Sequence, residues 1–325
     1  SELIMATYKE IKGVTVQTKD GDPDVFAGSW ASGGSLNTAR GELAGAGVQT
    51  AALAFGGDTP ATPGTTREAN TESYNGSTWT ELNDLNQGRT TLGGLGTSTA
   101  ALAFGGDVAT NVANTETWDG SSWTEVNDLN AARNTISGAG TTTAAIAQMG
   151  TPPNTAVESW NGTSWTETTE INTGRNFGCS VGTQTACLAI GGTPPVTGKT
   201  EYWNGSSWTE LNDLNTGRYT LAGSGIYTAA LVMGGQVPPL TNVTESWDGT
   251  NWTEVADLST TRGYVAAGVQ SPNQTSIVFG GTTPSVTGAT EEWSFPAGEF
   301  GFLTEGDLFL SGGTTLKGFG RAAGI

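Results

Sequence analysis

The stretch that decides the fold covers residues 89–133 and reads RTTLGGLGTSTAALAFGGDVATNVANTETWDGSSWTEVNDLNAAR. It opens with small residues, passes through a polar turn and an apolar run, and reaches the doublet Gly105-Gly106. A variable segment then leads to two aromatic runs, around Trp118 and Trp123, which Asp119-Gly120 separates. Short runs divided by turn residues are typical of β-strands, and Asp-Gly between two of them favours a tight hairpin. The stretch therefore predicts four short antiparallel strands.

This unit occurs six times, about 44 residues apart. Each copy has an Arg at one register, a Trp ten residues before it and, in most copies, another aromatic residue five residues before that Trp. All eleven Trp fall in these two registers. The arginines are Arg40, Arg89, Arg133, Arg175, Arg218 and Arg262, and the first set of tryptophans is Trp30, Trp79, Trp123, Trp165, Trp208 and Trp252. Four-stranded units of this length are typical of β-propeller blades, which bury their faces only against their neighbours.

The aromatic pairs also predict how the ring closes. Five pairs are complete: Tyr74/Trp79, Trp118/Trp123, Trp160/Trp165, Trp203/Trp208 and Trp247/Trp252. Trp30 has no partner before it, and Trp293 has none after it. Pairing these two strands would remove both open sheet edges. We therefore predict an all-β, six-bladed propeller over residues 24–295, closed by the N-terminal strand, with extensions at 1–23 and 296–325.

The order of features resembles the kelch repeat over residues 24–295: a Gly-Gly doublet ends the second strand, aromatics mark the third and fourth, and Arg lies near the blade junction. The resemblance implies a kelch-type propeller. The third copy replaces Phe-Gly-Gly with Gln148-Met149-Gly150, the fourth has Ile190-Gly191-Gly192, and the sixth has two extra residues around Pro272. Local distortions are therefore expected in these three blades.

The repeated residues have a structural and a functional interpretation. The aromatic rings suit a buried core, and the alternative is a platform on which sugars stack. The arginines suit bonds to backbone carbonyls or to the repeated glutamates, and the alternative is an anion site. These glutamates are Glu72, Glu116, Glu158, Glu201, Glu245 and Glu291. Cys179 and Cys187 fit two small buried side chains, with a cross-strand disulfide as the alternative.

Composition disfavours several functions. The net charge of −18 repels phosphate backbones and anionic membrane surfaces, so we expect no nucleic-acid partner. No stretch approaches 18 consecutive apolar residues, so we expect no membrane insertion. The chain has no His, the commonest general base and metal ligand. No nucleophile, nucleotide-binding or metal-ligand motif is present, so we expect no catalytic, cofactor or metal site. A propeller glycosidase with paired carboxylates is a remote alternative.

Variable loops on a rigid scaffold are common recognition sites, and six such loops join the second and third strands. They cover residues 58–70, 107–114, 151–156, 193–199, 236–243 and 282–289. Strand alternation places all six on one face. The candidate binding residues are Thr59, Pro60, Arg67, Pro152, Pro153, Pro194, Pro195, Pro238, Pro239 and Pro284. Neutral drift of solvated loops is the alternative.

A second resemblance lies outside the repeats. The opening Met5–Gly13 (MATYKEIKG) is similar to the start of kelch-type virion proteins of marine tailed bacteriophages. The pieces Glu305–Phe309 and Leu316–Phe319 are similar to a short hairpin of such proteins, expected here to turn at Gly312-Gly313.

This second resemblance implies a non-enzymatic protein on the virion surface, in a tail fibre, at the tail tip or on the capsid. Its extensions would contact other virion proteins, and its loops a host-surface glycan or protein. A purely architectural or decoration role is the alternative.

Overall fold

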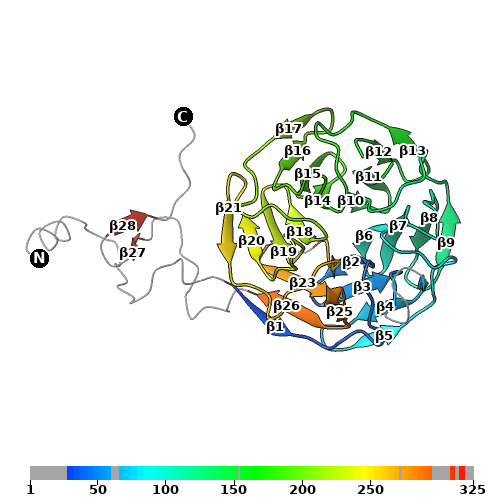
Figure 1. Ribbon diagram of the computed structural model, residues 1–325, viewed down its shortest axis with the longest axis horizontal. Helices are drawn as coiled ribbons and strands as arrows, with labels where there is room; N and C mark the ends of the chain where they lie inside the picture. The colour runs from blue at the N-terminus through cyan, green and yellow to red at the C-terminus, as the bar shows by residue number, and fades with distance from the viewer. Residues whose placement is uncertain are drawn as a thin grey trace, which may run out of the picture. The chain divides into compact units, whose positions relative to one another are not determined.

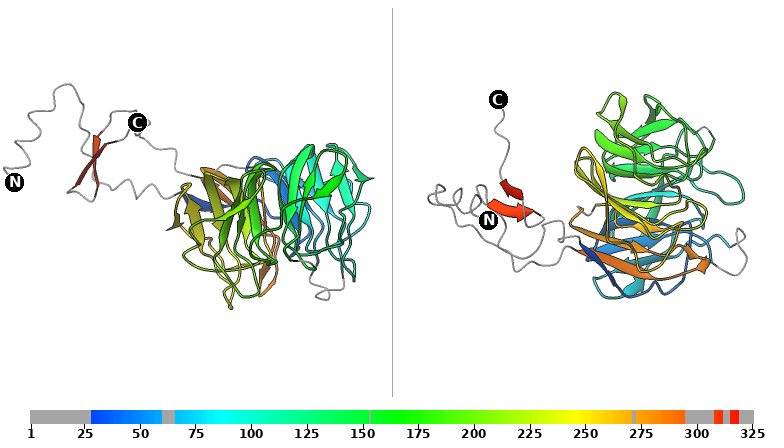
Figure 2. Two further views of the ribbon diagram at one scale, coloured as in Figure 1. Left: turned by 90° about the horizontal axis from the view of Figure 1, so that it is seen from above. Right: turned by 60° about the vertical axis from the view of Figure 1, so that its left-hand side comes forward.

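The computed structural model describes residues 28–59, 66–152, 154–270 and 273–294, and the backbone of strands 308–311 and 315–318. Six four-stranded antiparallel sheets are arranged radially around one axis, as Figure 1 shows, so the predicted six-bladed propeller is confirmed. Residues 29–294 form one compact unit, which Figure 2 shows from the side. No helix in the described part of the chain is long and apolar enough to cross a membrane.

The blades follow one another along the chain. The first consists of β2 (Ala44–Val48), β3 (Ala51–Phe55), β4 (Thr71–Tyr74) and β5 (Trp79–Glu81), and the second of β6 (Gly93–Thr97), β7 (Ala100–Phe104), β8 (Thr115–Trp118) and β9 (Trp123–Val126). The third has β10 (Ser137–Thr141), β11 (Ala144–Gln148), β12 (Val157–Trp160) and β13 (Trp165–Glu167). The fourth has β14 (Cys179–Thr183), β15 (Ala186–Ile190), β16 (Thr200–Trp203) and β17 (Trp208–Glu210). The fifth has β18 (Ala222–Ile226), β19 (Ala229–Met233), β20 (Thr244–Trp247) and β21 (Trp252–Val255).

The sixth blade combines both ends of the repeat region. It consists of β22 (Ala266–Ala267), β23 (Thr275–Phe279), β26 (Thr290–Ser294) and, at its outer edge, β1 (Ser29–Ser32). Trp30 lies opposite Trp293, with ring centroids 5.4 Å apart. The predicted closure by the N-terminal strand is therefore confirmed. Two short hairpins complete the described strands: β24 (Thr282–Thr283) with β25 (Ser285–Val286), and β27 (Leu308–Ser311) with β28 (Thr315–Gly318).

Side-chain size follows the wedge shape of the blades. The innermost strands are rich in Gly and Ala because six of them converge on the axis, whereas rings fill the wider gaps at the periphery. Phe55 of the first blade packs on Trp123 of the second at 4.9 Å, and Phe279 of the sixth packs on Trp79 of the first at 4.8 Å. Each blade thus buries its apolar face against the next.

Buried hydrogen bonds join neighbouring blades at the same aromatic register. The indole Nε1 of Trp79, Trp123, Trp165 and Trp252 donates to a Thr hydroxyl on the third strand of the preceding blade, over 2.9–3.0 Å. Trp30 makes the equivalent bond to Thr244 at 3.2 Å, so β1 takes the place of an ordinary outer strand. Trp208 differs because Val157 stands where the other blades have Thr, and its indole donates to the carbonyl of Thr169 instead.

Local distortions were predicted for the third, fourth and sixth blades, and they occur only in the sixth. The third and fourth blades keep the strand ladders of the first and second, so the expectation was wrong for them. Met149 adopts a φ of 62°, which is the left-handed conformation that Gly56 and Gly105 have at this register. In the sixth blade, β22 is shortened to two residues and the chain leaves the ladder after Gly268, whose N–H still donates to Ile277 O, so the expectation is confirmed there.

Candidate functional site

The repeated arginines form a buried belt. Each has 1% of its surface exposed or less and forms an ion pair with the glutamate of its own blade. Arg133, for example, donates to Glu158 at 2.8 Å and to the carbonyls of Met149 and Ala156 at 3.0 and 2.8 Å. Burial lowers the pKa of Arg133, and Glu158 opposes that shift. These side chains are buried and ion-paired, so they present no surface to a ligand.

The aromatic rings are equally enclosed. Apart from half-buried Trp30, the paired rings of both registers are at most 7% exposed. A platform on which sugars stack needs an open ring face, and these rings have none. Cys179 and Cys187 are free and buried, and burial raises the pKa of Cys179 to about 12. The disulfide that the sequence left open is not formed.

The six variable loops share one face of the propeller, here called the loop face. Strand alternation explains this placement, since each loop leaves the end of a second strand and returns to a third. The prolines at 152, 194, 195, 238, 239 and 284 are exposed there, whereas Pro60 and Pro153 lie outside the described residues. Thr59 donates to Glu68 within its own loop at 2.8 Å.

Polar contacts tie neighbouring loops together. Arg67 binds Asp107 of the second blade through Nε at 2.9 Å and Nη2 at 2.5 Å. Asn111 of the second blade donates to the carbonyl of Thr151 of the third at 2.7 Å. Of the predicted binding residues, Arg67 is thus brought against a neighbouring loop, while the exposed prolines stay spread around the ring. Sequence reasoning singled out Arg67 but not its partner.

The two chain ends leave the propeller on the opposite face, here called the hairpin face. Ser29 pairs with Ser294, and both lie at the end of the sixth blade away from its variable loop. The Asn-Gly and Asp-Gly turns lie on this face too, because they join third strands to fourth strands. Within residues 29–294, the chain therefore enters and leaves the propeller without crossing the loop face.

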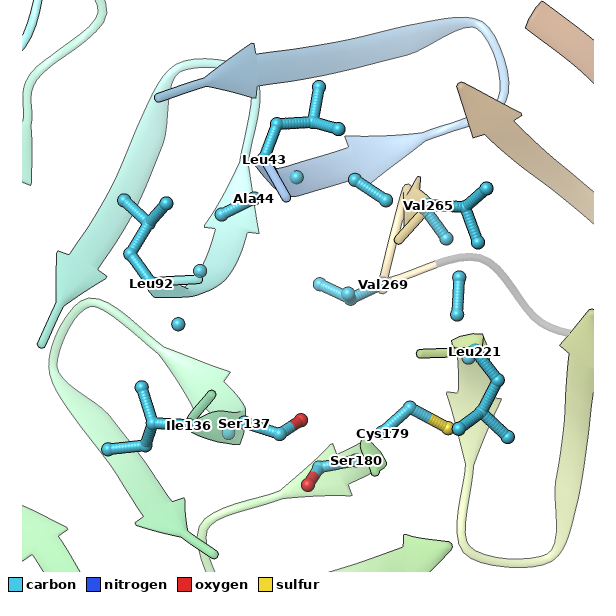
Figure 3. A pocket seen from close by; sticks show the side chains of 18 of the residues that line it. Leu43, Ala44, Leu92, Ile136, Ser137, Cys179, Ser180, Leu221, Val265 and Val269 are labelled. Carbon is cyan, nitrogen blue, oxygen red and sulfur yellow. The ribbon is translucent and has the colours of Figure 1, made fainter. Parts of the chain in front are cut away.

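A central channel runs along the axis, lined by the innermost strands of all six blades. Leu43, Leu92, Ile136, Leu221 and Val265 surround a cavity of about 120 Å³. Val269 points into the channel from the sixth blade, as Figure 3 shows.

The insertion of the sixth blade crosses the hairpin end of this channel. The backbone N–H of Gln270 donates to Gly47 O at 3.1 Å in the first blade, and its Nε2 donates to Gly140 O at 2.8 Å in the third. Gly225 N–H of the fifth blade donates to Val269 O at 3.4 Å. The sequence showed two extra residues near Pro272 but gave no sign that the chain would reach across the axis.

A closed ring of backbone hydrogen bonds surrounds the channel at the loop face. It is formed by Glu42, Thr91, Thr135, Phe177, Thr220 and Tyr264, each two residues after a repeated Arg, with φ between 51° and 56°. Each N–H donates to the carbonyl of the equivalent residue in the preceding blade, over 2.7–3.4 Å, and Glu42 closes the circle on Tyr264. A left-handed φ is unfavourable for a non-glycine residue. Six of them in one ring therefore store backbone strain, and they persist only because the surrounding structure fixes the backbone.

The side chains of this ring line a second cavity of about 100 Å³, here called the mouth cavity. The rings of Phe177 and Tyr264 lie 5.9 Å apart at 87°, and Tyr219 packs on Phe177 at 6.3 Å. Burial raises the pKa of Glu42, Asp58 adds to the shift, and a hydrogen bond from Thr90 opposes it. Sequence reasoning missed this site because the ring register carries three Thr, one Glu, one Phe and one Tyr, so it gives no repeated signal.

The described residues contain no group of three or more His, Cys, Asp or Glu side chains placed to hold a metal ion. Comparison with models of protein families finds no match, and comparison with curated protein sequences finds none either. The loop face and the mouth cavity are therefore the candidate functional sites of this six-bladed propeller.

Proposed function

We propose that the protein is a non-enzymatic surface protein of a bacteriophage virion, in a tail fibre or at the tail tip, that binds a partner through its loop face. One observation carries the binding part: both chain ends leave at the hairpin face, on the side away from the variable loops. Attachment through residues 1–23 and 296–325 to other virion proteins would leave the loops pointing outward. The virion part depends on the short motifs at Met5–Gly13 and Glu305–Phe309.

The loops have features that favour recognition. The Arg67–Asp107 and Asn111–Thr151 contacts fix three neighbouring loops, which reduces the ordering cost of binding. Val196 and Val237, in the loops of the fourth and fifth blades, are 41% and 37% exposed and offer apolar contacts. A surface glycan or protein of the host is the proposed partner.

The binding part is tested with the purified protein on an array of bacterial surface glycans and on host cell envelopes. The loop variants Val196→Asp and Val237→Asp should weaken binding, because each places a charge in the apolar contact. Tyr227→Asp on the hairpin face is the matched control and should bind as the wild type does. Loss of binding only in the control would reject the loop face as the site.

The virion part needs a separate test. Antibodies raised against the propeller should label intact phage particles at the tail in electron microscopy. Particles that carry no label at any position, although they come from a lysate that contains the protein, would contradict the proposal.

An architectural role is the second candidate, and one surface feature favours it. Ile226 and Tyr227 are 48% and 40% exposed at the hairpin face, and Tyr227 stacks on Tyr202 with centroids 5.1 Å apart. An apolar patch on the face from which the chain ends leave suits contact with a neighbouring virion subunit. Firm binding to another virion protein without any binding to envelopes or glycans would favour this role.

A further inference from the structure

We propose that the mouth cavity binds an organic ammonium group, either the quaternary or the primary ammonium end of a larger ligand. The positive charge would lie against the Glu42 carboxylate, beside the rings of Phe177 and Tyr264, with the rest of the ligand outside the channel. This site is independent of the virion role, because it depends only on the channel and its hydrogen-bonded ring.

The charge of the cavity favours a cation. Glu42 is the one carboxylate among the described residues that line it, and it forms no ion pair with the described residues around it. The nearby cation Arg67 is bound by Asp107 instead. Asp58 and Asp107 add negative charge near Glu42, and the net charge of −18 concentrates cations around the whole protein. A bound cation would offset the cost of burying the Glu42 carboxylate.

The shape of the cavity favours a head group over a whole sugar or peptide. A cavity of roughly 150 Å³ accommodates a benzene molecule. At about 100 Å³, the mouth cavity has room for a methylated or primary ammonium group. Its floor is apolar, formed by Leu43, Leu92 and Ile136 among others, and suits the methyl or methylene groups that surround such a charge.

The aromatic wall gives the chemistry that distinguishes an organic cation from a metal ion. Aromatic faces attract ammonium groups within about 6 Å of the ring centroid. Phe177 and Tyr264 both line the cavity and are half-buried. Ca²⁺ takes roughly six to eight oxygen ligands, and a single carboxylate among hydroxyl groups and rings is a poor match for it. Thr220 adds a buried hydroxyl with no hydrogen-bond partner among the described residues.

Isothermal titration calorimetry with choline chloride at pH 8 tests the proposal, with ionic strength held constant by sodium chloride. Choline should bind, whereas its neutral isostere 3,3-dimethyl-1-butanol should not. Glu42→Thr and Phe177→Thr should each weaken choline binding by about tenfold. Both variants should fold, since Thr occupies this register with the same φ in three other blades. Below the raised pKa of Glu42 the wild type should lose affinity, while Glu42→Thr should show no such loss.

Two comparisons make the proposal falsifiable. Glu254→Gln removes an exposed carboxylate from the outer strand of the fifth blade, and it should leave choline affinity unchanged. An equal loss in this variant would mean that only overall charge attracts the cation, and the proposal would fail. It would also fail if the neutral isostere bound as well as choline, or if calcium chloride bound at the mouth and displaced choline.

Discussion

At the scale of single residues, the arginine belt shows how one side chain sets the path of a crossover. One carboxylate oxygen of Glu158 accepts a hydrogen bond from Arg133. The other accepts hydrogen bonds from the backbone N–H and the side-chain amide of Asn130, at 2.7 and 2.8 Å. Asn130 lies in the connection from the second blade to the third. A buried charge therefore fixes the joint between two blades, and it does so in every copy of the repeat.

Replacing Arg133 with Ala should lower the free energy of unfolding by roughly 3–5 kcal/mol, because Glu158 and two carbonyls would stay buried without their cation. Urea unfolding followed by tryptophan fluorescence measures the change. Arg67→Ala is the control, since Arg67 and Asp107 are each 22% exposed and such pairs contribute about 1 kcal/mol or less. Equal stability of Arg133→Ala and the wild type would exclude a structural role.

Asp119 gives a pH-dependent prediction. Its Oδ1 accepts the N–H groups of Ser121 and Ser122 at 2.8 Å, and these bonds lower its pKa to about 2. A carboxylate with a lowered pKa stabilises the fold above its ordinary pKa near 4, and this contribution is lost as the pH falls toward 2. Asp119→Asn copies the Asn of other hairpins and should not show this acid-dependent loss. Acid titrations of both proteins, followed by circular dichroism, test it; parallel curves would contradict it.

Residue-level prediction succeeded where the repeat supplied a signal. Six arginines at one register with six glutamates at another predicted the buried pairs. Glu42, Phe177 and Tyr264 were missed, because what places them together is a backbone conformation that Thr also adopts. A single sequence shows side chains, not φ angles, so a site built on a shared backbone ring stays hidden when its side chains differ.

At the scale of elements, the third and fourth blades show why sequence departures need not distort a strand. The first glycine of the doublet usually faces a large side chain of the next blade; a Cβ on Gly105 would lie 3.2 Å from Ile136. In the third blade Met149 replaces that glycine, and the next blade has Gly178 where the others have Leu, Ile or Val. Met149 fills the space that Gly178 leaves, and it is fully buried.

This exchange predicts strong coupling between the two positions. Gly178→Leu should destabilise the protein, because a Cβ there would lie 2.8 Å from the sulfur of Met149. Met149→Gly should destabilise it too, by leaving a cavity. The double variant restores the arrangement of the other blades. Its free energy of unfolding should exceed the value expected from adding the two single losses by about 1 kcal/mol or more. Urea unfolding of the four proteins measures the coupling, and additive effects would contradict it.

At the scale of the whole molecule, ring closure was predictable because the aromatic register left two unpaired members. The path of residues 268–270 across the channel was not, since an insertion of this length gives no direction. The same limit applies to the contacts of Gln270 with Gly47 and Gly140, because they join blades that are far apart in the sequence.

The contribution of closure is measurable by truncation. Removing residues 1–27 keeps β1, whereas removing 1–32 deletes it and exposes the edge of β26 and the Trp293 ring. Loss of one packed tryptophan typically costs roughly 3–5 kcal/mol, which corresponds to a fall in Tm of about 4–7 °C at this chain length. Scanning calorimetry should show this fall only for the longer deletion. Equal Tm values for both truncations would show that β1 does not hold the ring closed.

The pairing of Ser29 with Ser294 also determines how the protein responds to mechanical tension. Pulling the two ends apart would strain this first pair alone and then peel β1 from β26 one residue pair at a time, like a zipper. Pulling both ends in the same direction leaves that strand pair unstrained. An anchor that grips both ends side by side would therefore let the disc withstand drag that would unravel it if it were tethered between two separate supports.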